Sequence, residues 1–259
     1  MKSWMSLPLV LLMLWPIPAA AQEEETEGPT WWAVFSEHVQ PSMIDQFEAS
    51  SAEFMEVIRA NAPEDMTYYT LSGPQTGYMY AIPMDSYEQF MEIGEKWESM
   101  VEKIGRDKWA EMEAKGSAGV THRELAFYVE RADLSYWPET PRLTMDEATM
   151  RHYDYVYPIP GKEQELEAVM GEWIELYKSH GANSGWTVYQ AFSGEDLPMY
   201  VIGTLATSRA DYEEDGNRLD EMMGDADDAL WEKTRNLMRK FDHTDAWVRP
   251  DLSLVPDDM

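Results

Sequence analysis

Five histidines are the residues best suited to acid–base or metal chemistry, because the chain has no cysteine. His122 is followed closely by Glu124, and His243 lies near Asp242 and Asp245. Both histidines are expected between a long helix and the last strand of two similar segments. They are therefore candidates for a symmetric pair of ligands or proton carriers, each oriented by a carboxylate. The alternative is two helix-end histidines that interact only with a helix C-terminus.

His38 and His152 are expected on strands. Because side chains alternate along a strand, His152 shares a face with Asp154. Such a pair, if it faces inward, can line a pocket or bind a haem iron. His38 lies at the opposite end of its own strand, so these two histidines are not equivalent. The alternative for both is a strand-end position in solvent.

Tyrosines crowd the expected strands, and their rings can line a cavity for an aromatic ligand. The alternative is that they pack the core as ordinary strand residues. Together the histidines and tyrosines give the candidate ligand-binding set: His38, Tyr69, Tyr80, His122, His152, Tyr155, Tyr189 and His243.

No catalytic motif accompanies this set. The sequence contains no P-loop, nucleophile elbow, HExxH zinc motif or dinucleotide glycine fingerprint. The run from Asp211 to Asn217 is similar to the start of a calcium loop, but Met222 occupies the position of the bidentate glutamate. We therefore expect no metal site, and the catalytic residues stay unknown.

The composition limits the classes of partner. The chain has 259 residues and a net charge of −29, with 49 acidic against 20 basic residues. This charge argues against binding to nucleic acid or to an anionic membrane surface, since both need lysine and arginine. With 44% hydrophobic residues, the chain can bury a full core.

The N-terminus has the pattern of an export signal. Lys2 precedes an apolar run over residues 7–15, and three alanines at residues 19–21 form a small-residue cleavage site. We therefore expect a signal peptide at 1–21, an acidic leader at 22–30, and a periplasmic or secreted mature protein. No cysteine follows the signal, so no lipid anchor is expected, and no membrane insertion is expected after cleavage.

A long internal repeat organises the rest of the chain. The octapeptide RADLSYWP at 131–138 recurs as RPDLSLVP at 249–256, and each copy closes a segment of the expected order βαββαβ. The apolar stripe of the first helix also repeats at an offset of 119: Phe47, Phe54, Met55 and Ile58 against Leu166, Trp173, Ile174 and Tyr177. This predicts two duplicated domains at 31–138 and 151–256, joined by a linker at 139–150. The two octapeptides are interpreted as the closing turns of the two domains.

The expected strands lie at 31–39, 66–71, 77–84 and 124–130, and again at 152–159, 186–192, 199–205 and 246–249. The second helix of each segment is expected to be long, and the later one to reach Phe241. Strands such as WWAVF, YMYAI and YDYVY carry large residues on both faces, so both faces of each sheet should be buried. The predicted fold class is α+β: two tandem ferredoxin-like domains that pack sheet to sheet as an intramolecular barrel.

This arrangement resembles the dimeric α+β barrel superfamily, which includes antibiotic-biosynthesis-type monooxygenases, NIPSNAP-like proteins and chlorite dismutases. The resemblance covers residues 31–256 and rests on element order, the long second helix and the repeat. Together with the export signal, it implies an exported barrel protein that binds a small apolar or aromatic ligand. The alternative it implies is an oxidoreductase or monooxygenase, either cofactor-free or haem-dependent. No cofactor is expected, since no haem-ligand motif matches.

The resemblance also bears on assembly, because single-copy members pair through the same sheets. Duplication supplies that contact within one chain, so we expect a monomer that is a pseudo-dimer, or a homodimer. A role in assembly without a ligand is a third alternative.

Overall fold

The structure is a computed structural model, and it describes residues 30–194 and 196–255. The predicted signal peptide and all of the acidic leader except Thr30 lie outside these residues. The first half contains β1 (Trp31–Val39), α1 (Ile44–Arg59), β2 (Tyr69–Ser72), β3 (Gly77–Met84), α2 (Gln89–Ile104), α3 (Arg106–Ser117) and β4 (Val120–Glu130). The second half contains β5 (Met150–Pro158), α4 (Glu163–His180), β6 (Trp186–Ala191), β7 (Tyr200–Ala206), α5 (Arg209–Met223), α6 (Asp225–Leu237) and β8 (Met238–Val248).

The strands form one closed antiparallel barrel in the order β1-β3-β2-β8-β5-β7-β6-β4. Within each half the strand order is that of a ferredoxin-like sheet, with its first and third strands in the centre. The two sheets are joined at their edges by β2 with β8 and by β4 with β6. The α+β barrel fold is therefore confirmed, with hydrogen-bonded seams that complete the expected sheet-to-sheet packing.

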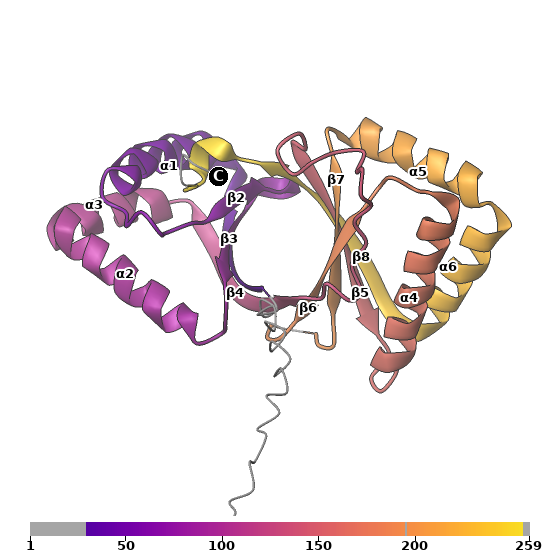
Figure 1. Cartoon of the computed structure of the whole chain (residues 1–259). Coiled ribbons are helices and arrows are strands. Elements are labelled where there is room, and N and C mark those ends of the chain that lie inside the picture. Colours follow the sequence, from indigo (N-terminus) through magenta and orange to yellow (C-terminus); the bar gives the residue numbers. More distant parts are fainter. Residues whose placement is uncertain (1–29, 195, 256–259) are drawn as a thin grey trace, which may run out of the picture.

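The helices cover the outside of the barrel on two opposite sides, as Figure 1 shows. Strand β5 illustrates how one sequence serves both faces. Val156 packs outward against Leu166 and Met170 of α4, whereas Tyr155 and Tyr157 point inward and pack with tyrosines of other strands. The strands carry large residues on both faces because helices bury one face of each sheet and the opposite side of the barrel buries the other.

The second helix of each half is shorter than its apolar pattern predicts. Each is broken at a glycine, Gly105 between α2 and α3 and Gly224 between α5 and α6, and both glycines have positive φ. The last strands are correspondingly longer: β8 begins at Met238, although helical spacing had predicted a helix to Phe241. Pairing with β5 decides this region, since Phe241 lies opposite Val156 in the ladder.

The two octapeptides connect the halves as well as closing them. Arg131 binds Asp133 beside it and also Glu167 on α4 of the other half, both at 2.7 Å. Arg249 does the same in reverse, binding Asp251 at 2.7 Å and Glu48 on α1 with two hydrogen bonds. Glu48 and Glu167 lie at the repeat offset of 119. Each closing segment therefore fixes its own turn and also holds the first helix of the opposite half.

Among the described residues, no helix is both long and apolar enough to cross a membrane.

Candidate functional site

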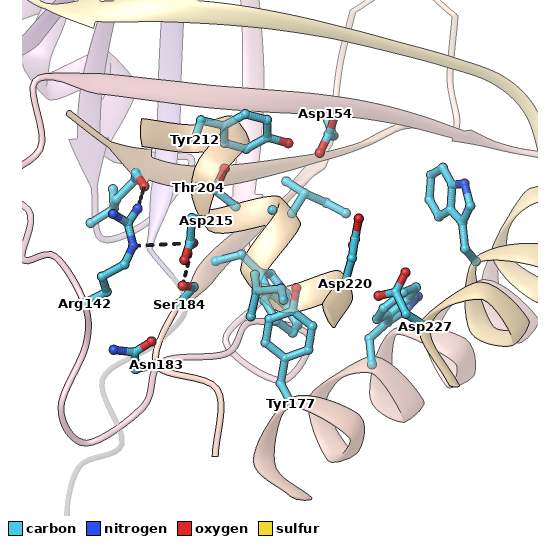
Figure 2. Close-up of a pocket in the computed structure, with 18 of the residues that line it drawn as sticks. Arg142, Asp154, Tyr177, Asn183, Ser184, Thr204, Tyr212, Asp215, Asp220 and Asp227 are labelled. Atoms are coloured by element: carbon cyan, nitrogen blue, oxygen red, sulfur yellow. Dashed lines mark hydrogen bonds and ion pairs between the residues drawn. The ribbon is translucent and has the colours of Figure 1, made fainter. Parts of the chain in front are cut away.

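A large cavity lies in the second half, between the outer face of the barrel and helices α4, α5 and α6. Its volume is about 550 Å³, and Figure 2 shows the side chains around it. The layer between sheet and helices in the first half holds a recess of only about 200 Å³. In that layer the ring of Trp109 packs against those of Phe54 and Trp97, with ring centres 5.0 and 5.6 Å apart. The cavity is therefore a property of the second half and not of the repeated fold.

Aromatic rings make up much of the cavity wall. They come from the first octapeptide, α4, β6, α5, α6 and β8: Trp137, Trp173, Tyr177, Trp186, Tyr212, Trp231 and Phe241. Several rings are held by their neighbours. Trp173 donates its indole N–H to Thr234 Oγ1 at 3.0 Å, and Tyr177 packs edge-on against Trp186 at 4.7 Å. The wall is thus a largely preformed surface for a flat apolar molecule.

A row of three polar side chains leads from the barrel surface to the cavity. His152 is almost fully buried, and its two ring nitrogens lie 2.7 Å from Asp245 Oδ1 and 3.1 Å from Asp154 Oδ1. The ring of Tyr212 stacks on the imidazole at 4.0 Å. Asp154 and Tyr212 both line the cavity. We call Asp245, His152 and Asp154 the Asp–His–Asp triad.

The first half shows what this position contains without a triad. The strand register places Ala33 opposite Phe127 where the second half has His152 opposite Asp245. Phe35 likewise occupies the position of Asp154, and Phe90, which stacks on Phe35, lies where Tyr212 lies. The two halves thus fill the same place with an apolar cluster and with a charged, hydrogen-bonded one. Burying charged groups costs free energy unless they are paired and hydrogen-bonded, and such clusters are common at functional sites, so the triad makes this layer of the second half the candidate site.

The two carboxylates of the triad favour the protonated form of His152. Burial by itself would lower the pKa of His152, but the hydrogen bonds to Asp154 and Asp245 outweigh burial and raise it. Burial would raise the pKa of Asp245, whereas its bonds to His152 and to Arg209 lower it. An imidazolium that donates a hydrogen bond to each carboxylate accounts for both the raised pKa of His152 and the lowered pKa of Asp245. The arrangement can store a proton beside the cavity and exchange it through Asp154.

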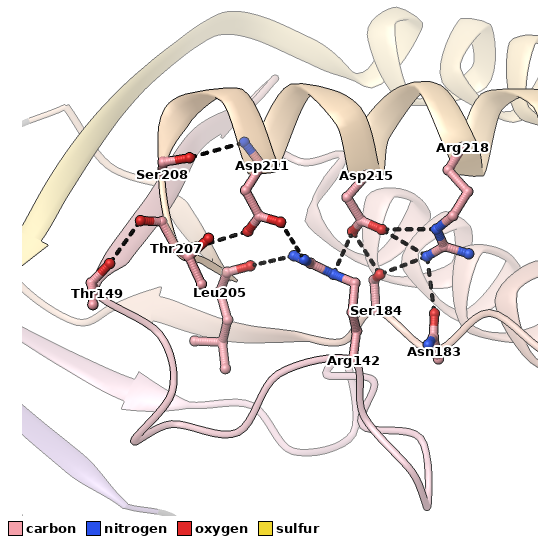
Figure 3. A network of polar contacts seen from close by, with 10 residues as sticks. All are labelled: Arg142, Thr149, Asn183, Ser184, Leu205, Thr207, Ser208, Asp211, Asp215 and Arg218. Atoms are coloured by element: carbon pink, nitrogen blue, oxygen red, sulfur yellow. Dashed lines mark hydrogen bonds and ion pairs between the residues drawn. The ribbon is translucent and has the colours of Figure 1, made fainter.

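One edge of the cavity is fixed by the predicted linker. Arg142 binds Asp211 at 2.7 Å and Asp215 at 3.4 Å on α5, and it donates to the carbonyl of Leu205 at 3.2 Å (Figure 3). Asp215 is also bound by Arg218 at 2.7 Å. The linker thus ties α5 to the barrel and compensates the charge of two carboxylates.

The predicted site residues fall into separate places. Tyr155 and Tyr189 pack inside the barrel, and Tyr69 lies near Trp32, whose ring also contacts Tyr189. Tyr80 packs on the other face of its sheet, in the helix-covered core of the first half. The tyrosines therefore do not share one site.

The histidines form two pairs. His38 and His122 lie opposite each other at one end of the barrel, with ring centres 5.9 Å apart and both side chains exposed. His152 and His243 lie on the helix-covered face of the second half, 5.6 Å apart. The structure corrects the expected equivalence of His122 and His243, which are strand residues three positions out of register. His243 occupies the position of Leu125.

None of these eight residues is among the side chains that line the cavity, and His152 is linked to it through Asp154 and Tyr212. The sequence analysis identified the His152–Asp154 face but not Asp245, Tyr212 or the tryptophan wall. Comparison of the two halves residue by residue would have revealed Asp245, since only the second half has charges there. The described residues contain no cluster of three or more acidic or histidine side chains arranged to hold a metal ion.

No family model matches the sequence, and no curated protein sequence matches it. Solved structures are similar in fold. An anthrone oxidase-like protein is 11% identical, with a TM-score of 0.57 over 90% of this chain and 95% of its own. A chlorite dismutase variant from Candidatus Nitrospira defluvii is 9% identical, with a TM-score of 0.54 over 87% and 93%. A monooxygenase-like protein from Lactobacillus acidophilus NCFM is 5% identical, with a TM-score of 0.52 over 88% and 97%.

Identities this low bear on the fold alone. The chain shares the α+β barrel fold of monooxygenase-like and chlorite dismutase-like proteins, which belong to the dimeric α+β barrel superfamily.

Proposed function

We propose that the protein binds a small aromatic molecule in the cavity of the second half. The observation that carries this proposal is the contrast between the halves. The same layer is filled by aromatic side chains in the first half, and in the second it is an open, aromatic-walled space of about 550 Å³. That volume lies in the range of small-molecule sites, roughly 300–1,000 Å³.

The preformed wall lowers the cost of binding. Trp173 and Trp186 each donate the indole N–H to an oxygen of the protein, so their rings are already oriented. A flat ligand then buries apolar area without first ordering these side chains. Asp154 and Tyr212 supply polar groups at the barrel side of the cavity.

Isothermal titration calorimetry with a neutral aromatic probe, naphthylmethanol, tests the proposal. The first half suggests the variant, because Tyr80 there occupies the strand position of Ile202, which lines the cavity. Ile202→Tyr should fill the space and weaken binding at least about tenfold, about 1.4 kcal/mol. Ile159→Tyr, at an exposed residue outside the cavity, is the matched control. Absence of saturable binding, or equal affinity in wild type and Ile202→Tyr, would refute the proposal.

A second candidate function is the oxidation of the bound aromatic by O₂ without a cofactor. The triad favours it, since a carboxylate backed by a histidine can take a proton from an acidic C–H or O–H group. The anthrone oxidase-like neighbour suggests anthrone as a probe. Loss of a proton to Asp154 gives a carbanion that O₂ oxidises, and anthrone plus O₂ becomes anthraquinone plus water.

Oxygen uptake with anthrone tests this second function. We expect one O₂ consumed for each anthraquinone formed, and a fall in kcat of roughly 100-fold or more in Asp154→Asn, the usual range for a lost general base. Asp242→Asn, at an exposed residue of β8 that does not line the cavity, serves as the control. Turnover that is unchanged in Asp154→Asn would rule out this role for the triad.

The cavity does not suit haem. The side chains that line it include no histidine, and both ring nitrogens of His152 are engaged by carboxylates. Asp154, Asp220 and Asp227 would also repel the propionates of a haem.

We further propose that the two halves arose by duplication and that the chain acts as a monomer. The seams that close the barrel lie within one chain, which supports this assembly. The export signal in the sequence supports a periplasmic or secreted location. Fractionation of cells that express the full chain, with detection of a product lacking residues 1–21, tests the location.

A further inference from the structure

The charges around the cavity are strongly one-sided. Five carboxylates line it, from Asp154, Glu213, Asp215, Asp220 and Asp227. Arg142 is the single lysine or arginine among the described lining residues. An excess of one sign in a partly enclosed space concentrates ligands of the opposite sign.

Part of this charge is already compensated. Asp215 is bound by Arg142 and Arg218, and Glu213 by Arg209 at 2.9 Å. Asp154 accepts a hydrogen bond from His152. These contacts partly neutralise three of the five carboxylates, which therefore attract a positively charged ligand less strongly.

Asp220 and Asp227 are different. Within the described part of the chain, neither side chain has an ion pair or a side-chain hydrogen bond. Figure 2 shows the carboxylates of Asp154 and Asp220 turned toward the space between the strand and the helices, with Asp227 beside them on α6. Burial raises the pKa of Asp227, and the nearby charges of Asp220 and Asp228 add to this effect. A positive ligand group would relieve that repulsion.

The aromatic wall favours the same kind of ligand. A ring face attracts a cation, by about 0.5–2 kcal/mol depending on exposure. Two lining rings already have guanidinium partners: Arg209 lies 5.4 Å from the ring of Tyr212, and Arg235 lies 6.0 Å from that of Trp231. The wall therefore combines the two elements that bind organic ammonium groups, aromatic faces and carboxylates.

We propose that the ligand of this cavity is an aromatic amine in its protonated form, with its ring against the tryptophans and its ammonium group between Asp220 and Asp227. This inference rests on the proposed binding function and adds the charge of the ligand to it. It excludes aromatic carboxylates, because their negative charge would be repelled by the carboxylates that line the cavity.

Three probes of equal ring size separate the possibilities: naphthylmethylamine, naphthylmethanol and naphthoate, each titrated by calorimetry into the mature wild-type protein at low salt. We expect the amine to bind at least about tenfold more tightly than the alcohol, and the carboxylate at least about tenfold more weakly, each factor being about 1.4 kcal/mol. Raising the salt concentration should bring the affinities of the three probes closer together, since salt screens partly exposed charges.

Variants locate the effect. Asp220→Asn and Asp227→Asn should each reduce the preference for the amine over the alcohol several-fold, with the affinity for the alcohol little changed. Asp225→Asn, on α6 like Asp227 but outside the cavity, should keep the preference. It thereby controls for the general negative charge of the protein.

The outcomes distinguish the two proposals. If no probe binds, the binding function itself is refuted, and this inference with it. If the alcohol binds as tightly as the amine, or if the preference survives in Asp220→Asn and Asp227→Asn, the cavity binds aromatics but the cation inference is wrong.

Discussion

The contact between Arg249 and Glu48 gives the sharpest test of how the two halves are held together. Arg249 donates to both oxygens of Glu48, at 2.5 and 2.7 Å, across the boundary between the halves. The side chains are 19% and 35% exposed, so the pair lies between a surface ion pair and a buried one. Exposed pairs contribute about 0.2–1 kcal/mol, and breaking a fully buried pair costs about 3–5 kcal/mol. We therefore expect a coupling energy of about 1–2 kcal/mol.

A double-mutant cycle with Arg249→Met and Glu48→Gln measures this coupling. Methionine keeps much of the arginine stem, and glutamine keeps the hydrogen bond from Tyr78, which donates to Glu48 at 2.6 Å. For a chain of this size, 1 kcal/mol shifts the Tm by about 2–4 °C. Arg249→Met should therefore lower the Tm by several degrees, and Glu48→Gln should add little to it.

The pH dependence supplies an independent check. The hydrogen bond from Arg249 is the main cause that lowers the pKa of Glu48 in the folded protein. A carboxylate with a lowered folded-state pKa stabilises the fold above its unfolded pKa, and this stabilisation is lost as the pH falls through the folded pKa. The coupling should thus be complete at pH 7 and disappear in acid. A coupling energy below about 0.3 kcal/mol at pH 7, the usual limit of additivity, would refute this account of the closing segments.

Two further predictions concern single residues. The pKa of His152 is raised by its carboxylate partners, so its contribution to stability is complete below its unfolded pKa, about 6.5, and is lost as the pH rises through the higher folded value. The difference in unfolding free energy between wild type and His152→Gln should shrink from pH 6 to pH 9, and a constant difference would contradict the triad. Gly224, with φ 54° and ψ −134°, adopts a conformation that L residues avoid, so Gly224→Ala should cost about 1–3 kcal/mol in urea unfolding. Gly116→Ala, in α3 with nothing within 4 Å of the added methyl group, is the control and should be neutral or stabilising. An equal loss of stability at both sites would contradict the role given to the backbone conformation of Gly224.

Much of the architecture is determined by local sequence patterns. The repeated octapeptides and the apolar stripe of α1 and α4 predict two similar halves, and alternating large residues predict sheets buried on both faces. Both patterns recur at regular spacings along the chain, so they can be recognised from the sequence alone. The element boundaries did not follow from the pattern. Phe241 fits a helical stripe, but pairing with β5 places it in a strand.

The candidate site depended on contacts that the sequence does not display. His152 and Asp154 are two residues apart, and strand alternation is enough to put them on one face. Asp245 is 93 positions away from His152 and becomes its partner only through the register of β5 with β8. Tyr212 reaches the same imidazole from α5, whose position over the sheet depends on packing.

The sequence by itself therefore determined the repeat, the fold class and the strong negative charge, because periodicity, order and composition are properties of the chain. Only the tertiary structure decided that the open space lies beneath the helices of the second half, and that Tyr155 and Tyr189 pack inside the barrel while Tyr80 packs under the helices of the first half. A cavity is what remains when side chains from distant segments fail to fill a volume, and that difference depends on their packing together.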